Sequence, residues 1–170
     1  MSNTDKKTRY FLHRYMPVFL LFTSILNEID FNNFEFKYFS FNFAYILIFY
    51  YSLKREGGIG YILIFLAGLF NDVVNGLPMG ISSLSYLLLC TAAQYLKNIT
   101  LRPSLFKDWI FFLITVLVLN VITFSYFIIF FKYEINYFDQ IINIMCTFLM
   151  YLVFSYIFRL YDDFILGKFN

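Results

Sequence analysis

The most unusual stretch of this sequence is Gly68–Gly80, GLFNDVVNGLPMG, which sets an acid, two amides, three glycines and a proline between two apolar runs. On a helix, one face carries Gly68, Asp72, Asn75 and Gly76, at positions i, i+4, i+7 and i+8. Small and polar residues on one face let membrane helices approach closely and form hydrogen bonds. An acid near the hydrocarbon is costly, so it usually faces a protein interior or water and marks function.

Two interpretations of Asp72 follow from this spacing. The acid could be buried and functional, or it could lie at a membrane–water boundary beside a tight hairpin over residues 75–80. The Asn75-Gly76 pair favours a turn, and Pro78 suits the first turn of a following helix. The spacing alone does not choose between the two.

The composition predicts an integral membrane protein. Of the 170 residues, 61% are hydrophobic and 14% are charged, whereas a soluble domain is nearer half apolar and a quarter charged. The net charge of +2 and the lack of a basic stripe disfavour nucleic-acid binding. Cys90 and Cys146 lie in apolar runs, so neither a disulfide framework nor a metal site is expected. No cofactor is expected, and His13, beside Arg14, is interpreted as an interfacial residue.

Six apolar runs predict six transmembrane helices in one all-α domain over residues 1–170. The first four cover about Phe11–Ile29, Phe41–Leu53, Ile59–Asn75 and Pro78–Leu96. The fifth and sixth cover about Asp108–Phe131 and Phe138–Leu160, followed by a short charged tail, Tyr161–Asn170. The second run is shorter than the roughly 20 residues that a straight span needs.

The positive charges predict the orientation. Six spans would leave eleven of the thirteen lysines and arginines on the side of the N-terminus, and only Lys37 and Lys132 on the other. Because lysine and arginine are enriched in cytoplasmic loops, both termini are expected in the cytoplasm. The turn at Asp72–Pro78 is then expected toward the outer face.

Single polar residues inside the later runs are expected to face other helices and not lipid. Tyr86 and Gln94 share a helical stripe in the fourth run, and Asn120 is central to the fifth. Asn143 and Thr147 begin a series at i+4 spacing in the sixth, which we interpret as a packing seam and not as a substrate site.

The spacing Gly68-Leu69-x-x-Asp72-x-x-x-Gly76-x-Pro78-x-Gly80 resembles the signature of MreD, the rod shape-determining membrane protein family of bacteria. The length, the six expected spans and the cationic turn Lys54-Arg55 before the third span also fit. Many members carry a proline in that turn, where this chain has Glu56-Gly57-Gly58. The resemblance is dense over about Phe41–Leu105 and weak in the first and last spans.

This resemblance implies a non-enzymatic scaffold in the bacterial inner membrane that supports cell elongation, peptidoglycan synthesis and cell shape. Its implied partner is MreC, within a wider assembly of MreB filaments, RodZ, the glycosyltransferase RodA and a penicillin-binding transpeptidase, among membrane lipids. Gly68, Asp72, Gly76, Pro78 and Gly80 would be the motif and partner-binding residues. The family is also similar in architecture to the substrate-binding subunits of energy-coupling-factor transporters.

Three functions remain to be weighed. A membrane scaffold is favoured, because no nucleophile–base pair or phosphate-binding glycine loop is present. The alternative is a small-molecule-binding membrane subunit of a transporter, with a cavity lined by Asp72, Tyr86, Gln94, Asn120 and Asn143. Against it stands the lack of further charged residues at membrane depth. An intramembrane enzyme is the least favoured.

Overall fold

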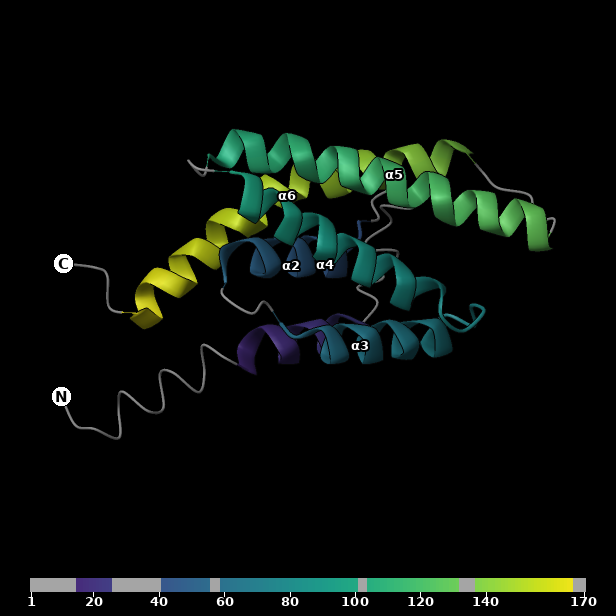
Figure 1. The fold of residues 1–170 in the computed structure, drawn as a ribbon, viewed down its shortest axis with the longest axis horizontal. Coiled ribbons are helices and arrows are strands. Elements are labelled where there is room, and N and C mark those ends of the chain that lie inside the picture. The colour runs from purple at the N-terminus through teal and green to yellow at the C-terminus, as the bar shows by residue number, and fades with distance from the viewer. Residues whose placement is uncertain (1–14, 26–40, 56–58, 101–103, 132–136, 167–170) are drawn as a thin grey trace, which may run out of the picture.

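A computed structural model of the chain describes residues 15–25, 41–55, 59–100, 104–131 and 137–166 (Figure 1). The elements in these ranges are a helical segment, Tyr15–Ile25, followed by α2 (Phe43–Lys54), α3 (Tyr61–Val74), α4 (Ile81–Ile99), α5 (Leu105–Phe131) and α6 (Tyr137–Leu166). Each of these elements is a helix, so the all-α prediction is confirmed for the part of the chain that the structure describes.

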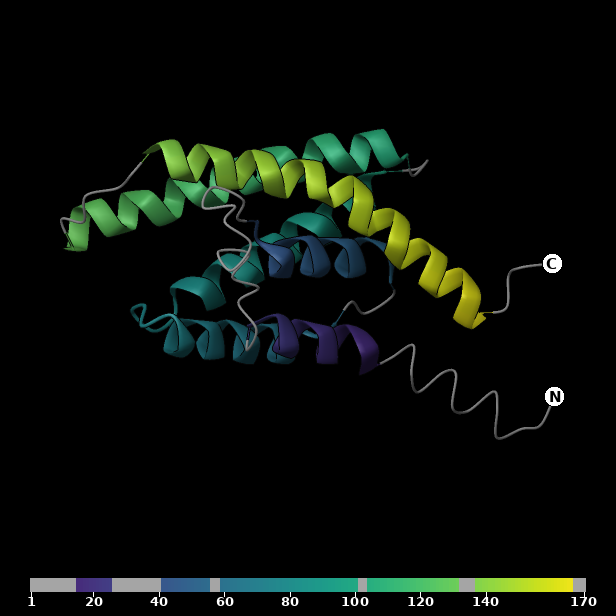
Figure 2. The same ribbon diagram turned by 180° about the vertical axis from the view of Figure 1, so that it is seen from behind.

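Helix α2 is the centre of the bundle, with the other helices arranged around it (Figure 2). Nine of its twelve residues are buried, including Ile46–Phe49, which have no exposed surface. A helix that is apolar all round belongs in a core. Its first turn is capped by Asn42, whose side chain accepts a hydrogen bond from the Tyr45 amide, 3.1 Å away.

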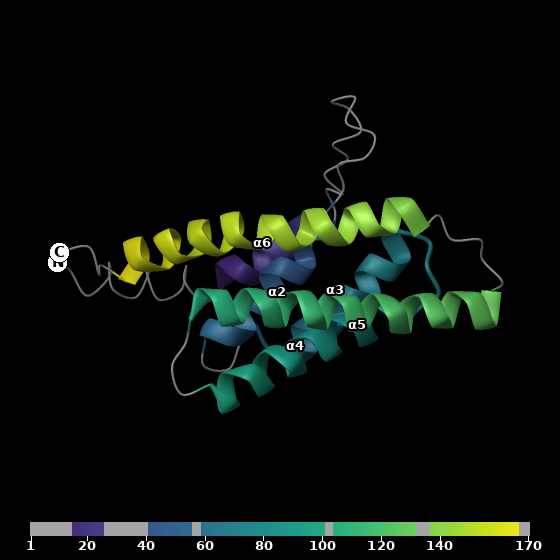
Figure 3. The same cartoon turned by 90° about the horizontal axis from the view of Figure 1, so that it is seen from above.

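Aromatic rings join α2 to the pair formed by α5 and α6, which run side by side (Figure 3). The Phe49 ring meets the Phe112 ring edge to face, with centroids 5.1 Å apart, and Phe112 stacks on Tyr151 at 4.5 Å. Trp109 stacks on Phe148 at 4.3 Å and donates its indole N–H to the Phe148 carbonyl oxygen at 2.9 Å. Such aromatic pairs add to the free energy gained from burial alone.

Several helix boundaries differ by a few residues from the sequence prediction, and two of these differences have a clear physical cause. Helix α4 begins at Ile81, so Pro78 precedes the helix and does not lie in its first turn. The cause is Gly80, whose φ of 104° does not fit an α-helix. Helix α6 continues to Leu166, into the expected charged tail, where Ile165 is buried and Arg159 pairs with Asp163 one turn apart.

Two helices are long and apolar enough to cross a membrane, over Leu105–Phe130 and Phe138–Ile165. The segment Tyr15–Ile25 and helices α2 and α3 are apolar but shorter. At 1.5 Å per residue, a helix as short as α2 extends only about 18 Å, against roughly 30 Å of hydrocarbon. Helix α4 has nineteen residues but is less apolar, with three serines in its first turns. The structure therefore supports a membrane protein and leaves six crossings as a prediction.

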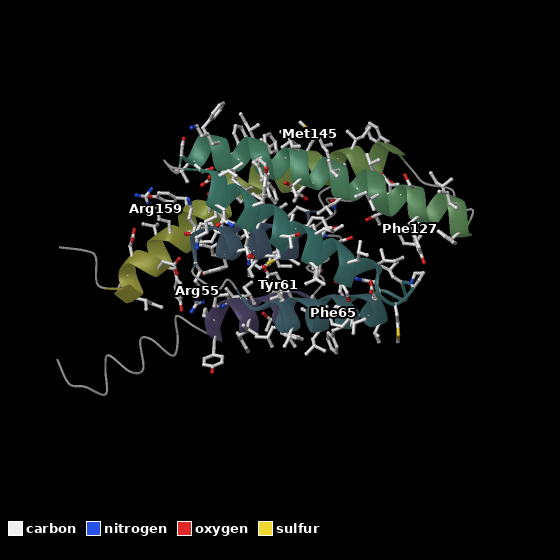
Figure 4. The ribbon with its side chains drawn as sticks, in the orientation of Figure 1. Arg55, Tyr61, Phe65, Phe127, Met145 and Arg159 are labelled. Atoms are coloured by element: carbon white, nitrogen blue, oxygen red, sulfur yellow. The ribbon has the colours of Figure 1, made fainter. Side chains whose placement is uncertain are left out.

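The described basic side chains gather at one end of the bundle. They are Lys54 and Arg55 after α2, Lys97 near the end of α4, Lys107 at the start of α5 and Arg159 near the end of α6. Figure 4 shows Arg55 and Arg159 at this end and Phe127 of α5 at the opposite end. The Lys54 ammonium lies 2.7 Å from the Asp108 carboxylate, and the Lys97 ammonium donates to the Arg55 carbonyl at 3.0 Å.

Lys54 should stabilise the fold mainly because its ammonium group balances the buried negative charge of Asp108. The Asp108 side chain is 2% exposed, while that of Lys54 is 32% exposed, so losing the lysine strands a buried carboxylate, whereas losing the acid lets the lysine turn to water. We expect Lys54→Met to reduce the free energy of unfolding by roughly 2 kcal/mol and Asp108→Asn by less. A double-mutant cycle measured by thermal unfolding in detergent tests this, and equal single effects would contradict it.

Candidate functional site

The residues of the Gly68–Gly80 stretch form the hairpin between α3 and α4. Helix α3 ends at Val74, and Gly76 follows with a φ of 62°, in the left-handed region. The Leu77 amide donates to the Asp72 carbonyl at 2.8 Å, and the Gly76 amide donates to the Val73 carbonyl at 3.4 Å. These two bonds make a Schellman motif, which satisfies the last carbonyls of the helix. The turn predicted from Asn75-Gly76 is therefore present.

Asp72 caps the start of α4 from the neighbouring helix. Its side chain is 0% exposed. One carboxylate oxygen accepts from the Gly80 amide at 2.7 Å, and the other accepts from the Ser82 amide at 2.9 Å. Gly80, the N-cap residue of α4, has no side chain that could do this. A carboxylate at a helix N-terminus also interacts favourably with the helix dipole.

Gly68 lets α3 and α4 approach to backbone contact. A Cβ added at Gly68 would lie 2.3 Å from the Ser83 Cα and 2.6 Å from the Ser83 nitrogen. The Ser83 hydroxyl donates to the Phe65 carbonyl at 3.1 Å, and the Asn71 amide donates to the Ser82 hydroxyl at 2.9 Å. The face that carries Gly68 and Asp72 therefore packs on α4 of the same chain.

Asp72 is a buried structural residue and not an acid exposed at a boundary. The acid is buried, and its two oxygens bind backbone amides of α4. Its carboxylate therefore holds the hairpin together. It would affect the binding of a partner only indirectly, by fixing the positions of α3 and α4. Gly68 acts in the same way, through the close contact with Ser83.

A cavity of about 520 Å³ lies beside the hairpin, toward the end of the bundle opposite the basic residues. It is lined by the first turn of α2, the hairpin, the first two turns of α4, the part of α5 from Val116 onward and the first half of α6, with Ser24 and Ile25 of the first helical segment. The lining contains six side-chain carboxamides, which belong to Asn42, Asn71, Asn75, Asn120, Gln140 and Asn143. A polar cavity of this size can hold ordered water or a ligand.

Part of this polar lining is bonded within the protein. The Thr147 hydroxyl accepts from the backbone N–H of Asn42 at 3.0 Å and donates to the backbone carbonyl of Asn143 at 2.7 Å. The Ser85 and Thr123 hydroxyls lie 3.4 Å apart. The Asn120 amide donates to the Val116 carbonyl of its own helix at 2.8 Å, while its oxygen accepts no hydrogen bond from the described residues.

The structure brings together four of the five interior polar residues expected from the sequence. Tyr86, Asn120, Asn143 and Thr147 all line the cavity. Gln94 lies elsewhere, where it accepts a hydrogen bond from the Tyr61 hydroxyl between α3 and α4. Asp72 is also outside the described lining, because its carboxylate points to the α4 backbone.

The sequence did not show that the other four amides of the lining belong to a cavity. Asn42, Asn71, Asn75 and Gln140 lie near helix ends, where amides are ordinary. The one available signal was Asn42, an asparagine directly before an apolar run, which is typical of an N-cap.

Among the described residues, no three histidine, cysteine, aspartate or glutamate side chains lie close enough to hold a metal ion. Comparison of the chain with protein-family models, with curated proteins and with solved structures gave no match. The interpretation of the site therefore depends on its geometry and on the resemblance of the Gly68–Gly80 stretch.

Proposed function

We propose that this protein is a multi-pass protein of the bacterial inner membrane, with six helices across the bilayer and both termini in the cytoplasm. Three features support this topology. The described basic side chains gather at one end of the bundle, as the positive-inside tendency requires. The outer faces of α5 and α6 expose many large apolar side chains. The shorter helices belong to the same bundle: α2 packs on α6, α4 packs on α5, and α3 packs on α4.

In this proposal the protein is a non-enzymatic scaffold of the cell-elongation machinery, which binds MreC and so supports peptidoglycan synthesis and cell shape. The observation that carries the proposal is the construction of the hairpin. The motif residues Gly68, Asp72, Gly76 and Gly80 each fix a contact or a turn in it. A hairpin fixed in this way presents a defined outer surface to a neighbour.

That outer surface carries an apolar groove. The groove has a volume of about 300 Å³ and is lined by Phe65 of α3, by Gly80, and by Leu84, Leu87, Leu88 and Thr91 of α4. Phe65 points away from the bundle in Figure 4. A groove between two closely packed helices suits a third helix, since association in lipid depends on close van der Waals packing. We assign it to the single membrane span of MreC, with MreB, RodZ, RodA and the transpeptidase joining through the wider assembly.

Filling the groove should release the partner. The Leu84 side chain is 54% exposed and lies in the groove, and Ile114 of α5 is 52% exposed and lies outside it. We expect Leu84→Trp to reduce co-purification of MreC in mild detergent at least tenfold, and Ile114→Trp to leave it unchanged. Cells that depend on the Leu84→Trp protein should become round.

The control for folding is the amount of each variant in the membrane and its melting temperature, which should match the wild type for both substitutions. Undiminished MreC recovery with Leu84→Trp would exclude the groove as the docking surface. Absence of MreC from wild-type preparations would exclude the scaffold function itself.

A further inference from the structure

We propose that the cavity beside the α3–α4 hairpin binds an uncharged, hydrogen-bonding small molecule, a function separate from the docking of a partner helix. Its volume of about 520 Å³ falls in the range of ligand sites, which combine apolar walls with a few placed polar groups. The groove for the partner lies on the outer face of α4, on Leu84 and Leu88, whereas Ser85 and Tyr86 of α4 face the cavity.

The chemical class of the ligand follows from the lining. Six carboxamides and several hydroxyls line the cavity, contributed by the first helical segment and by α2 to α6, and the described lining contains no acidic or basic side chain. A carboxamide offers a donor and an acceptor side by side, which matches amide, hydroxyl or heterocyclic groups. An ion inside this cavity would lack a counter-charge, and burying an unpaired charge is costly.

Three amides of the lining have hydrogen-bonding groups that the described residues do not use. The Asn120 oxygen accepts no hydrogen bond from the described residues, and the side chains of Asn75 and Gln140 form none with them. Phe41, Phe43 and Phe124 supply apolar walls beside these amides. The ligand should therefore have one polar edge and one apolar face, and it should enter at the end of the bundle away from the basic residues.

The test uses the full chain in detergent, with Cys90 and Cys146 replaced by alanine. A single reporter cysteine is placed in the cavity by Ser85→Cys, and separately by Thr123→Cys, both changes of small volume. The probes are three methanethiosulfonates: neutral hydroxyethyl, anionic sulfonatoethyl and cationic trimethylammonioethyl. Met79→Cys is the control, because Met79 is 77% exposed in the hairpin and outside the cavity lining.

We expect the neutral reagent to label either reporter at least tenfold faster than both charged reagents, after each rate is divided by its rate at Met79→Cys. Reporters that label with none of the reagents, or equally with all three, would overturn the proposal.

Protection then tests binding. Small molecules extracted from the source cells are separated by ion exchange into neutral, anionic and cationic fractions. The neutral fraction should slow labelling of Ser85→Cys at least tenfold and leave Met79→Cys unaffected. Adding Asn120→Leu, which keeps the side-chain size and removes the amide, should abolish that protection. Protection by an ionic fraction alone, or by no fraction, would overturn the proposal, and neither result bears on the recovery of MreC.

Discussion

Gly68→Ala should destabilise this protein far more than an alanine at either of the other two glycines of the α3–α4 hairpin. The added methyl group would lie 2.3 Å from the Ser83 Cα, and the obstacle is backbone, which cannot turn aside as a flexible side chain can. The helices would have to separate, breaking the Ser83–Phe65 and Asn71–Ser82 hydrogen bonds. We expect a loss of roughly 3 kcal/mol or more in the free energy of unfolding, measured by thermal unfolding in detergent.

Gly76→Ala is the matched control for this change. A Cβ at Gly76 would meet nothing within 4 Å, although its φ of 62° makes alanine strained there. The expected cost is therefore about 1 kcal/mol, from backbone strain alone. If Gly68→Ala melted at the same temperature as Gly76→Ala, the close contact between α3 and α4 would be wrong.

Much of the fold could be predicted because the apolar runs are long and their interruptions are distinct. The turn at Asn75-Gly76 was readable because glycine supplies the positive φ that ends a helix. The start of α4 was not, since Pro78 is typical of a first turn and nothing local revealed that Gly80 would adopt a positive φ.

The site was harder to predict than the helices because its contacts join different helices. The sequence places Asp72 near an apolar boundary, but it does not show that the partners of the carboxylate are the amides of Gly80 and Ser82. In the same way, Asn120 and Asn143 could be recognised as interior polar residues. That they line one cavity together with Asn42 depends on how the helices cross in space.

The role of Asp72 can be separated into a structural and a direct functional part. Its two oxygens satisfy two amides at the start of α4. Asp72→Ala leaves the partly buried Gly80 amide and the buried Ser82 amide without this acceptor, which should cost about 3 kcal/mol. Asp72→Asn keeps one acceptor oxygen but turns an N–H₂ group toward the other amide, so its cost should be about half that of Asp72→Ala.

Asp163→Asn is the control, because Asp163 is partly exposed and its nearest arginine nitrogen is 3.9 Å away. Such an exposed pair contributes little to stability.

The decisive comparison sets the recovery of MreC, the proposed partner, against the melting temperature of these variants. If the carboxylate acts only by capping α4, the recovery of MreC at 37 °C should be lower with Asp72→Asn than with the wild type, and lowest with Asp72→Ala. For each variant it should return to the wild-type level at a temperature where that variant is folded. A variant that melts like the wild type and still loses MreC would show instead that the acid contacts the partner. The buried position of Asp72 and its two short bonds to α4 favour the first result, because a carboxylate already bonded twice has little left to offer a neighbouring helix.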